Sequence, residues 1–181
     1  MGNKQGGGGE EERLQLIQNQ TGFDRKKIEK EFKAWKKQFK HGTMNKEEFK
    51  KISASFLPPQ QNTPEYVERL FNAFDGDRSG QIDFGEFMLA IAMSSSENNE
   101  DKVKFCFRSL DLDGNGTLDK EEILYAVTLL FKTRPGLDKK APEAVNTPQK
   151  VVDEIFRRVD INNDGSLSAD ELIDFMNNDP K

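Results

Sequence analysis

The chain has 181 residues, of which 33% are charged and 34% are hydrophobic, and its formal net charge is −5 at pH 7. This balance predicts a soluble globular protein with a modest core. No apolar run approaches the ~18 residues that span a bilayer, and no secretory signal is recognisable, so any membrane contact is expected to be peripheral, on the inner face. The one cysteine, Cys106, excludes an internal disulfide and favours a cytoplasmic location.

The first segment, residues 1–22, is predicted to be flexible, with at most a short helix at 10–18. Its four consecutive glycines, Gly6–Gly9, have the largest backbone entropy to lose on ordering. The chain begins Met1-Gly2-Asn3, and a glycine directly after the first methionine is the acceptor for N-myristoylation. Gly2 is therefore a candidate lipidation site, although Gly6 stands where that motif prefers serine or threonine. The alternative is an unmodified terminus.

Residues 25–40 are predicted to form an amphipathic helix, with Asp24 as its N-cap. Apolar residues recur at helical spacing, and lysines recur on the opposite face. The apolar positions are Ile28, Phe32, Trp35 and Phe39, and the basic ones are Lys26, Lys30, Lys33, Lys37 and Lys40. Residues 25–51 contain eleven basic and four acidic residues, which predicts a surface that binds anionic membranes. A merely solvated helix face is the alternative.

From residue 23 onward the chain repeats a unit of helix, polar loop and helix. Three of the loops begin at Asp75, Asp111 and Asp160, and apolar helical stripes flank each of them. A proline-containing linker, residues 133–147, interrupts the pattern. The sequence predicts one pair of units over residues 23–93 and a second pair over residues 94–132 and 148–178, in an all-α fold.

The three loops have the twelve-residue spacing of calcium-binding EF-hands. Such a loop offers oxygen atoms from positions 1, 3, 5, 7 and 9 and from a bidentate glutamate at 12, with glycine at 6 for a sharp turn. Hard oxygen donors in a flexible ring favour Ca²⁺, with Mg²⁺ as an option in the calcium-free state. The predicted ligands are Asp75, Asp77, Ser79, Gln81, Asp83, Glu86, Asp111, Asp113, Asn115, Thr117, Asp119, Glu122, Asp160, Asn162, Asp164, Ser166, Ser168 and Glu171.

A fourth loop, residues 37–48, keeps the turn glycine and an apolar eighth residue but has lost its ligands. Lys37, Phe39 and His41 occupy its first, third and fifth positions, and neither an ammonium group nor a phenyl ring ligates a cation. The loop is expected to fold without metal, so at most three ions bind. The Asp160 loop has three carboxylates at ligand positions where the other two loops have four, and it is predicted to bind most weakly.

The chain resembles the neuronal calcium sensor family, the relatives of recoverin, the guanylate cyclase-activating proteins and the potassium-channel-interacting proteins. The resemblance covers nearly the whole chain, and it rests on the Met1-Gly2-Asn3 start, the disabled first loop, the three intact loops and the proline-containing linker. The chain departs from the family in having Phe39 and Lys40 where Cys-Pro is usual, and in stopping at Lys181 without a further helix. The resemblance implies two EF-hand pairs in one compact unit.

The resemblance also implies a calcium sensor whose apolar groove takes up an amphipathic helix of a membrane-associated guanylate cyclase, receptor kinase or ion channel. A passive calcium buffer and a constitutive subunit of the calcineurin B type are the alternatives. An enzyme is not expected, because the single histidine, His41, has no recognisable catalytic partner. No aromatic and basic platform indicates nucleic-acid binding. By resemblance the groove residues, which could also be core, are Trp35, Phe49, Ile52, Phe56, Leu57, Phe87 and Ile91.

Overall fold

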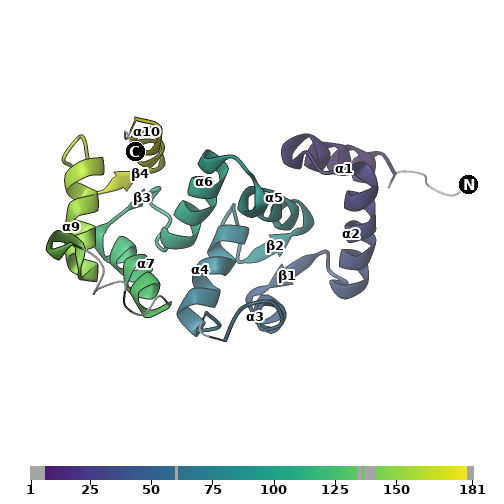
Figure 1. Cartoon of the computed structure of the whole chain (residues 1–181). Helices are drawn as coiled ribbons and strands as arrows, with labels where there is room; N and C mark the ends of the chain where they lie inside the picture. Colours follow the sequence, from purple (N-terminus) through teal and green to yellow (C-terminus); the bar gives the residue numbers. More distant parts are fainter. Residues whose placement is uncertain (1–6, 60, 134–135, 137–141, 179–181) are drawn as a thin grey trace, which may run out of the picture. The chain divides into compact units, whose positions relative to one another are not determined.

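The computed structural model describes residues 7–59, 61–133, 136 and 142–178, which form helices joined by loops and short strands (Figure 1). The helical structure confirms the predicted all-α class. The chain divides into two compact units between Phe105 and Cys106, where the resemblance implied a single unit. None of the described helices is long and apolar enough to cross a membrane.

The first unit begins with α1 (Gly7–Thr21) and α2 (Arg25–Gln38). Asp24 caps α2, as expected, because its side chain accepts a hydrogen bond from the backbone N–H of Lys26. α1 is longer than the helix expected at 10–18. Its Leu14 and Ile17 are buried in the core of the unit, and this burial offsets the entropy lost when the segment becomes ordered. Gly2 lies outside the described residues.

Two EF-hand motifs lie in this unit. α2, β1 (Thr43–Asn45) and α3 (Lys46–Ser53) form the first, and α4 (Pro64–Phe74), β2 (Gln81–Asp83) and α5 (Phe84–Ser95) form the second. The boundary between the two compact units falls within the next helix, α6 (Asn99–Leu110). β1 pairs with β2 in an antiparallel sheet that places Met44 opposite Ile82, and both side chains are buried. The ligand-poor first loop is thus joined to the Asp75 loop through their eighth residues.

The second unit contains β3 (Thr117–Leu118), α7 (Lys120–Thr133), the 3-10 helix η1 (Glu143–Val145), α9 (Pro148–Val159), β4 (Leu167–Ser168) and α10 (Ala169–Asn178). β3 pairs with β4 in the same antiparallel manner, with Leu118 opposite Leu167. Both leucines are buried in a core that includes Phe107, Val152 and Phe156. This small sheet therefore joins the Asp111 and Asp160 loops.

Aromatic side chains are six of the fourteen buried residues in the core of the first unit. Phe49 of α3 lies between two rings of α4, with centroid distances of 5.6 Å to Phe71 and 5.4 Å to Phe74. Such pairs contribute about 0.5–1.5 kcal/mol beyond the area that they bury. These contacts hold α4, which leads into the Asp75 loop, against the helix that leaves the first loop.

Candidate metal sites and an apolar hollow

The Asp75 loop starts where α4 ends, and Asp75 is held by the backbone of its own loop. Asp75 is buried, and its Oδ1 and Oδ2 atoms accept hydrogen bonds from the N–H groups of Ser79 (3.0 Å) and Gly80 (2.9 Å). Gly80 has a φ of 81°, in the left-handed region that glycine enters without strain. The turn glycine therefore lets the chain fold back over the first ligand position.

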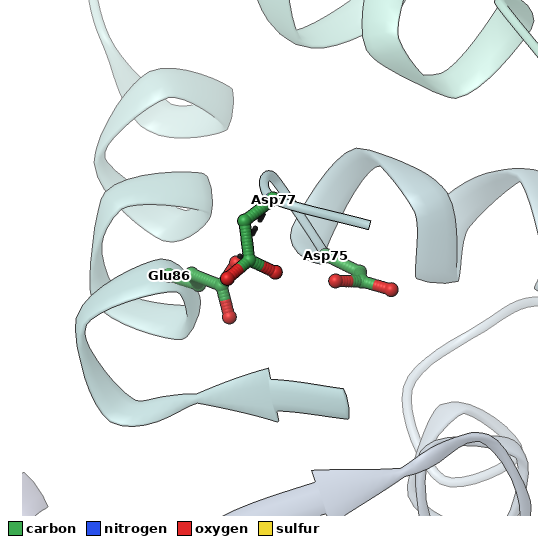
Figure 2. A group of neighbouring side chains, drawn as sticks. All are labelled: Asp75, Asp77 and Glu86. Atoms are coloured by element: carbon green, nitrogen blue, oxygen red, sulfur yellow. Dashed lines mark hydrogen bonds between the residues drawn. The ribbon is translucent and has the colours of Figure 1, made fainter. Parts of the chain in front are cut away.

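Glu86 closes this loop from the first turn of α5. Its Oε1 atom accepts a hydrogen bond from the N–H of Asp77 at 3.2 Å, and its Oε2 atom accepts one from the N–H of Asp83 at 2.8 Å. Figure 2 shows that the carboxylates of Asp75, Asp77 and Glu86 gather at the loop. Oxygen atoms of these three residues lie within 4.8 Å of one another.

The electrostatics of the Asp75 loop fit a divalent cation. Burial raises the pKa of Glu86 above its ordinary value. Hydrogen bonding from Ser79 lowers the pKa of Asp77. Like charges at this spacing repel, and a cation bound among them would offset both the repulsion and the desolvation of Glu86. Because the donors are all oxygen atoms, the set fits Ca²⁺.

The Asp111 loop has the same construction. The carboxylates of Asp111, Asp113 and Glu122 offer oxygen atoms within 4.8 Å of one another, and Asp111 and Glu122 are buried. Glu122 Oε1 accepts a hydrogen bond from the N–H of Leu112 at 2.7 Å, and burial raises the pKa of Glu122. This second site therefore repeats the first, because its glutamate also accepts N–H groups from the start of the loop and from the ninth position.

The Asp160 loop differs from the other two. Asp160 Oδ2 still accepts a hydrogen bond from the N–H of Gly165 at 3.1 Å. Glu171 Oε2 accepts bonds from the N–H and the hydroxyl of Ser168 at 2.9 and 2.8 Å, and the backbone bond lowers the pKa of Glu171. Within the described ranges, groups of at least three acidic side chains close enough to share an ion occur at the Asp75 and Asp111 loops alone.

The remaining predicted ligands lie on the same three loops, and their role in binding a metal stays a prediction.

One predicted ligand, Asp83, makes a contact that the sequence did not predict. Arg13 of α1 donates a hydrogen bond of 2.6 Å to Asp83 Oδ2, at the ninth position of the Asp75 loop. Nothing in the sequence signals this contact, because its partners are 70 residues apart and Arg13 belongs to no motif.

The ligand-poor loop at 37–48 folds as expected from its turn glycine. Phe39, at the third position, is buried in the core, and His41, at the fifth, is exposed. Asn45, at the ninth position, caps α3 in a reciprocal arrangement with Glu48. This loop therefore keeps the residues that cap the following helix, but it has the buried ring of Phe39 at a position where other EF-hand loops have a ligand.

An apolar hollow of about 380 Å³ opens between helices of the first unit. Six of the predicted groove residues line it. Trp35 instead lies buried in the core, so its place in a groove stays a prediction. The residues that line the hollow are Met44, Phe49, Ile52, Phe56, Leu57, Tyr66, Leu70, Phe74, Phe87, Ile91, Ser94 and Phe105. Leu70 and Phe74 could have been anticipated from the apolar stripe that precedes the Asp75 loop.

The basic stripe of α2 forms an exposed surface. Lys26, Lys30, Lys33 and Lys37 surround Ala34 on this face, and Lys40 is exposed just beyond the end of the helix. Within the described part of the chain, these lysines make no ion pair. Their charge is therefore directed to solvent.

Comparison with known proteins identifies the repeated units. Residues 100–177 match the EF-hand domain pair family, and residues 67–91 match an EF hand family. S-modulin of Aquarana catesbeiana is 32% identical over 96% of this chain and 86% of its own length. Human recoverin is 30% identical over 96% of this chain and 87% of its own length. Guanylyl cyclase-activating protein 2 of Lithobates pipiens is 37% identical over 80% of this chain and 75% of its own length. The chain therefore belongs to the neuronal calcium sensor family of EF-hand proteins.

Proposed function

We propose that this protein is a calcium sensor, which binds up to three Ca²⁺ ions through the loops at Asp75, Asp111 and Asp160 and then exposes its apolar hollow to a partner. One observation carries the proposal. Glu86, the last residue of the Asp75 loop, directly precedes Phe87, which lines the hollow with Ile91 of the same helix. A shift of Glu86 toward a bound ion would move α5 and one wall of the hollow with it.

The partner that we propose is an amphipathic helix of a regulated protein. The lining of the hollow is aromatic and aliphatic, and Phe56 is exposed at its edge. Such a surface accepts apolar side chains that recur on one face of a helix. One relative is named a guanylyl cyclase-activating protein. By extension, we propose that the partner is a membrane-associated guanylate cyclase, receptor kinase or ion channel.

We also propose that the protein meets its partner at an anionic membrane. The exposed lysines of α2 would contribute about 1 kcal/mol each near a negatively charged lipid surface. An acyl chain on Gly2, outside the described residues, would supply the second anchor that stable peripheral binding requires. We propose that stable binding requires both the lysine face and the acyl chain, because a single acyl chain gives only marginal membrane binding.

The test is calorimetric binding of a synthetic amphipathic helix of leucine and lysine, in Ca²⁺ and in chelator. A sensor binds the peptide in Ca²⁺ and loses it in chelator, and Phe56→Ser weakens binding. Leu16→Ser is the matched control, because Leu16 and Phe56 are both 55% exposed and Leu16 does not line the hollow. Equal binding in both conditions would indicate a constitutive subunit. Calcium binding with no peptide binding would indicate a buffer.

A further inference from the structure

The N-terminal helix contacts a metal loop directly through Arg13 and Asp83. The guanidinium Nη2 and the carboxylate Oδ2 are 2.6 Å apart, and both side chains are partly exposed. Asp83 stands at the ninth position of the Asp75 loop, where EF-hands supply a ligand directly or through water. The guanidinium of Arg13 thus contacts a carboxylate that is predicted to ligate Ca²⁺ in this loop.

Both oxygen atoms of the Asp83 carboxylate are engaged. Oδ1 accepts the backbone N–H of Glu86 at 2.9 Å and so caps α5, while Oδ2 accepts Arg13. The capping bond is needed in any state in which α5 is helical. The contact that a bound ion would contest is therefore the one with Arg13.

The corresponding residue of the next loop offers a direct comparison. Asp119 also uses its Oδ1 atom to cap a helix, by accepting the N–H of Glu122 at 2.9 Å. No ion pair engages Asp119 within the described residues. The Asp75 and Asp111 loops share aspartates at their first, third and ninth positions and a glutamate at their twelfth, and the ion pair at the ninth position is one feature that distinguishes them.

α1 packs on the turn that carries the metal-binding glutamate. A Cβ atom built on Gly85 would lie 3.8 Å from the side chain of Ile17, and Gly85 precedes Glu86 in the first turn of α5. Two further ion pairs, Glu10–Lys36 at 3.0 Å and Glu11–Arg25 at 2.6 Å, join α1 to α2. Among the ion pairs described for α1, the one made by Arg13 reaches a metal loop.

From these contacts we propose that Arg13 sets the calcium affinity of the Asp75 loop and couples it to the docking of α1. Docked α1 places a positive charge on a ligand group, which weakens binding of Ca²⁺ to this loop. Reciprocally, Ca²⁺ at this loop weakens the hold of α1, because coupling between two binding events is mutual. This inference rests on the proposed function, since it requires that the Asp75 loop binds Ca²⁺.

The test is calorimetric titration of the full chain with Ca²⁺ at low salt. Glu122→Gln and Glu171→Gln form the parental background, so that the Asp75 loop gives the measured heat. Arg13→Gln is expected to tighten binding about two- to fivefold, the range of an exposed ion pair. The difference in affinity between Arg13→Gln and the parental protein should become smaller at roughly 1 M salt, where the Debye length falls to about 3 Å. Lys51→Gln, which removes an equal charge from an exposed position on α3 and breaks none of the described ion pairs of α1, is expected to leave the affinity unchanged.

The outcomes separate this inference from the proposed function. If the parental protein gives no heat that Glu86→Gln abolishes, the Asp75 loop binds no Ca²⁺ and the proposed function fails for this loop. If the parental protein binds and Arg13→Gln leaves the affinity equal or weaker, only the role of Arg13 is overturned. The role of Arg13 is likewise overturned if Lys51→Gln tightens binding as much as Arg13→Gln does.

Hydrogen exchange gives a second readout. Ca²⁺ is expected to accelerate amide exchange of residues 9–21 in the parental background, and Arg13→Gln is expected to show the faster exchange already in chelator. Protection of α1 that does not respond to Ca²⁺ in the parental background would contradict the coupling.

Discussion

Trp35 Nε1 donates a hydrogen bond of 2.9 Å to the backbone carbonyl oxygen of Gly42, the turn glycine of the ligand-poor first loop. The indole ring packs on Phe39, with 4.4 Å between ring centroids. Where the other loops gather carboxylates, this one is held by a tryptophan and a phenylalanine. Its structure is therefore expected to be independent of Ca²⁺.

Trp35→Phe tests this independence. The variant loses the bond to Gly42 and leaves a smaller ring in a packed core, so the free energy of unfolding should fall by about 1–3 kcal/mol. Urea denaturation in Ca²⁺ and in chelator measures the loss, which should be similar in both. A loss confined to the calcium-loaded protein would show that metal, rather than Trp35, orders the first loop.

The three intact loops are expected to differ in affinity, with the Asp160 loop weakest by roughly an order of magnitude. It has one carboxylate fewer at its ligand positions, and the clustering of three acidic side chains described for the other two loops does not extend to it. Calcium titrations of Glu86→Gln, Glu122→Gln and Glu171→Gln measure the order. Glu171→Gln should remove the weakest step, and loss of the tightest step instead would reverse the assignment.

The stability of the metal-free protein should depend on pH through Glu86 and Glu122. Burial raises both pKa values, so each glutamate binds a proton more strongly in the folded than in the unfolded chain. Their contribution is present below the ordinary glutamate pKa and is lost as the pH rises through the raised values. The free energy of unfolding in chelator should therefore fall as the pH rises above 4.5, the ordinary value.

Glu171 changes the free energy of unfolding with pH in the opposite sense, and it does so at lower pH. Its pKa is lowered, so its contribution is present above the ordinary value and is lost as the pH falls through the lowered one. Urea denaturation in chelator across this range separates the two effects. Combining Glu86→Gln with Glu122→Gln should flatten the upper slope, and a slope that persists would assign it to other groups.

The lysine face of α2 should direct the protein to anionic membranes. Combined replacement of Lys30, Lys33 and Lys37 by glutamine is expected to weaken binding to phosphatidylserine vesicles by at least tenfold at low salt, since each lysine contributes about 1 kcal/mol. Replacement of Lys102, Lys104 and Lys132, which are also exposed, is the charge-matched control. Equal binding to neutral and anionic vesicles would show that this face is a solvated surface with no role in membrane binding.

The EF-hand loops were predictable from sequence because the residues that define their fold are close together in the chain. Ligand positions, the turn glycine and the apolar eighth residue all fall within twelve residues, and the strands form at Met44, Ile82, Leu118 and Leu167, the eighth positions. The extent of α1 was not predictable, because glycines weaken the local signal and the burial of Leu14 and Ile17 depends on tertiary contacts.

The place of Trp35 and the pairing of Arg13 could not be predicted from sequence, because both depend on long-range contacts. Helical spacing places Trp35 on the apolar face of α2 but does not say whether that face meets the core or the hollow. The structure places Trp35 in the core, 5.8 Å from Phe84 and 5.1 Å from Phe87 between ring centroids. The pairing of Arg13 with Asp83 is likewise set by the packing of α1 on α5, which no periodicity within either helix encodes.

Calcium binding is expected to expose the apolar hollow of the first unit. The most direct measurement is the fluorescence of a dye for exposed apolar surface, with wild type and Glu86→Gln compared in Ca²⁺ and in chelator. We expect a calcium-dependent rise in the wild type that Glu86→Gln largely removes, because Glu86 links the loop to α5. Calcium binding by the wild type without any change in dye fluorescence would contradict the sensor function and indicate a buffer.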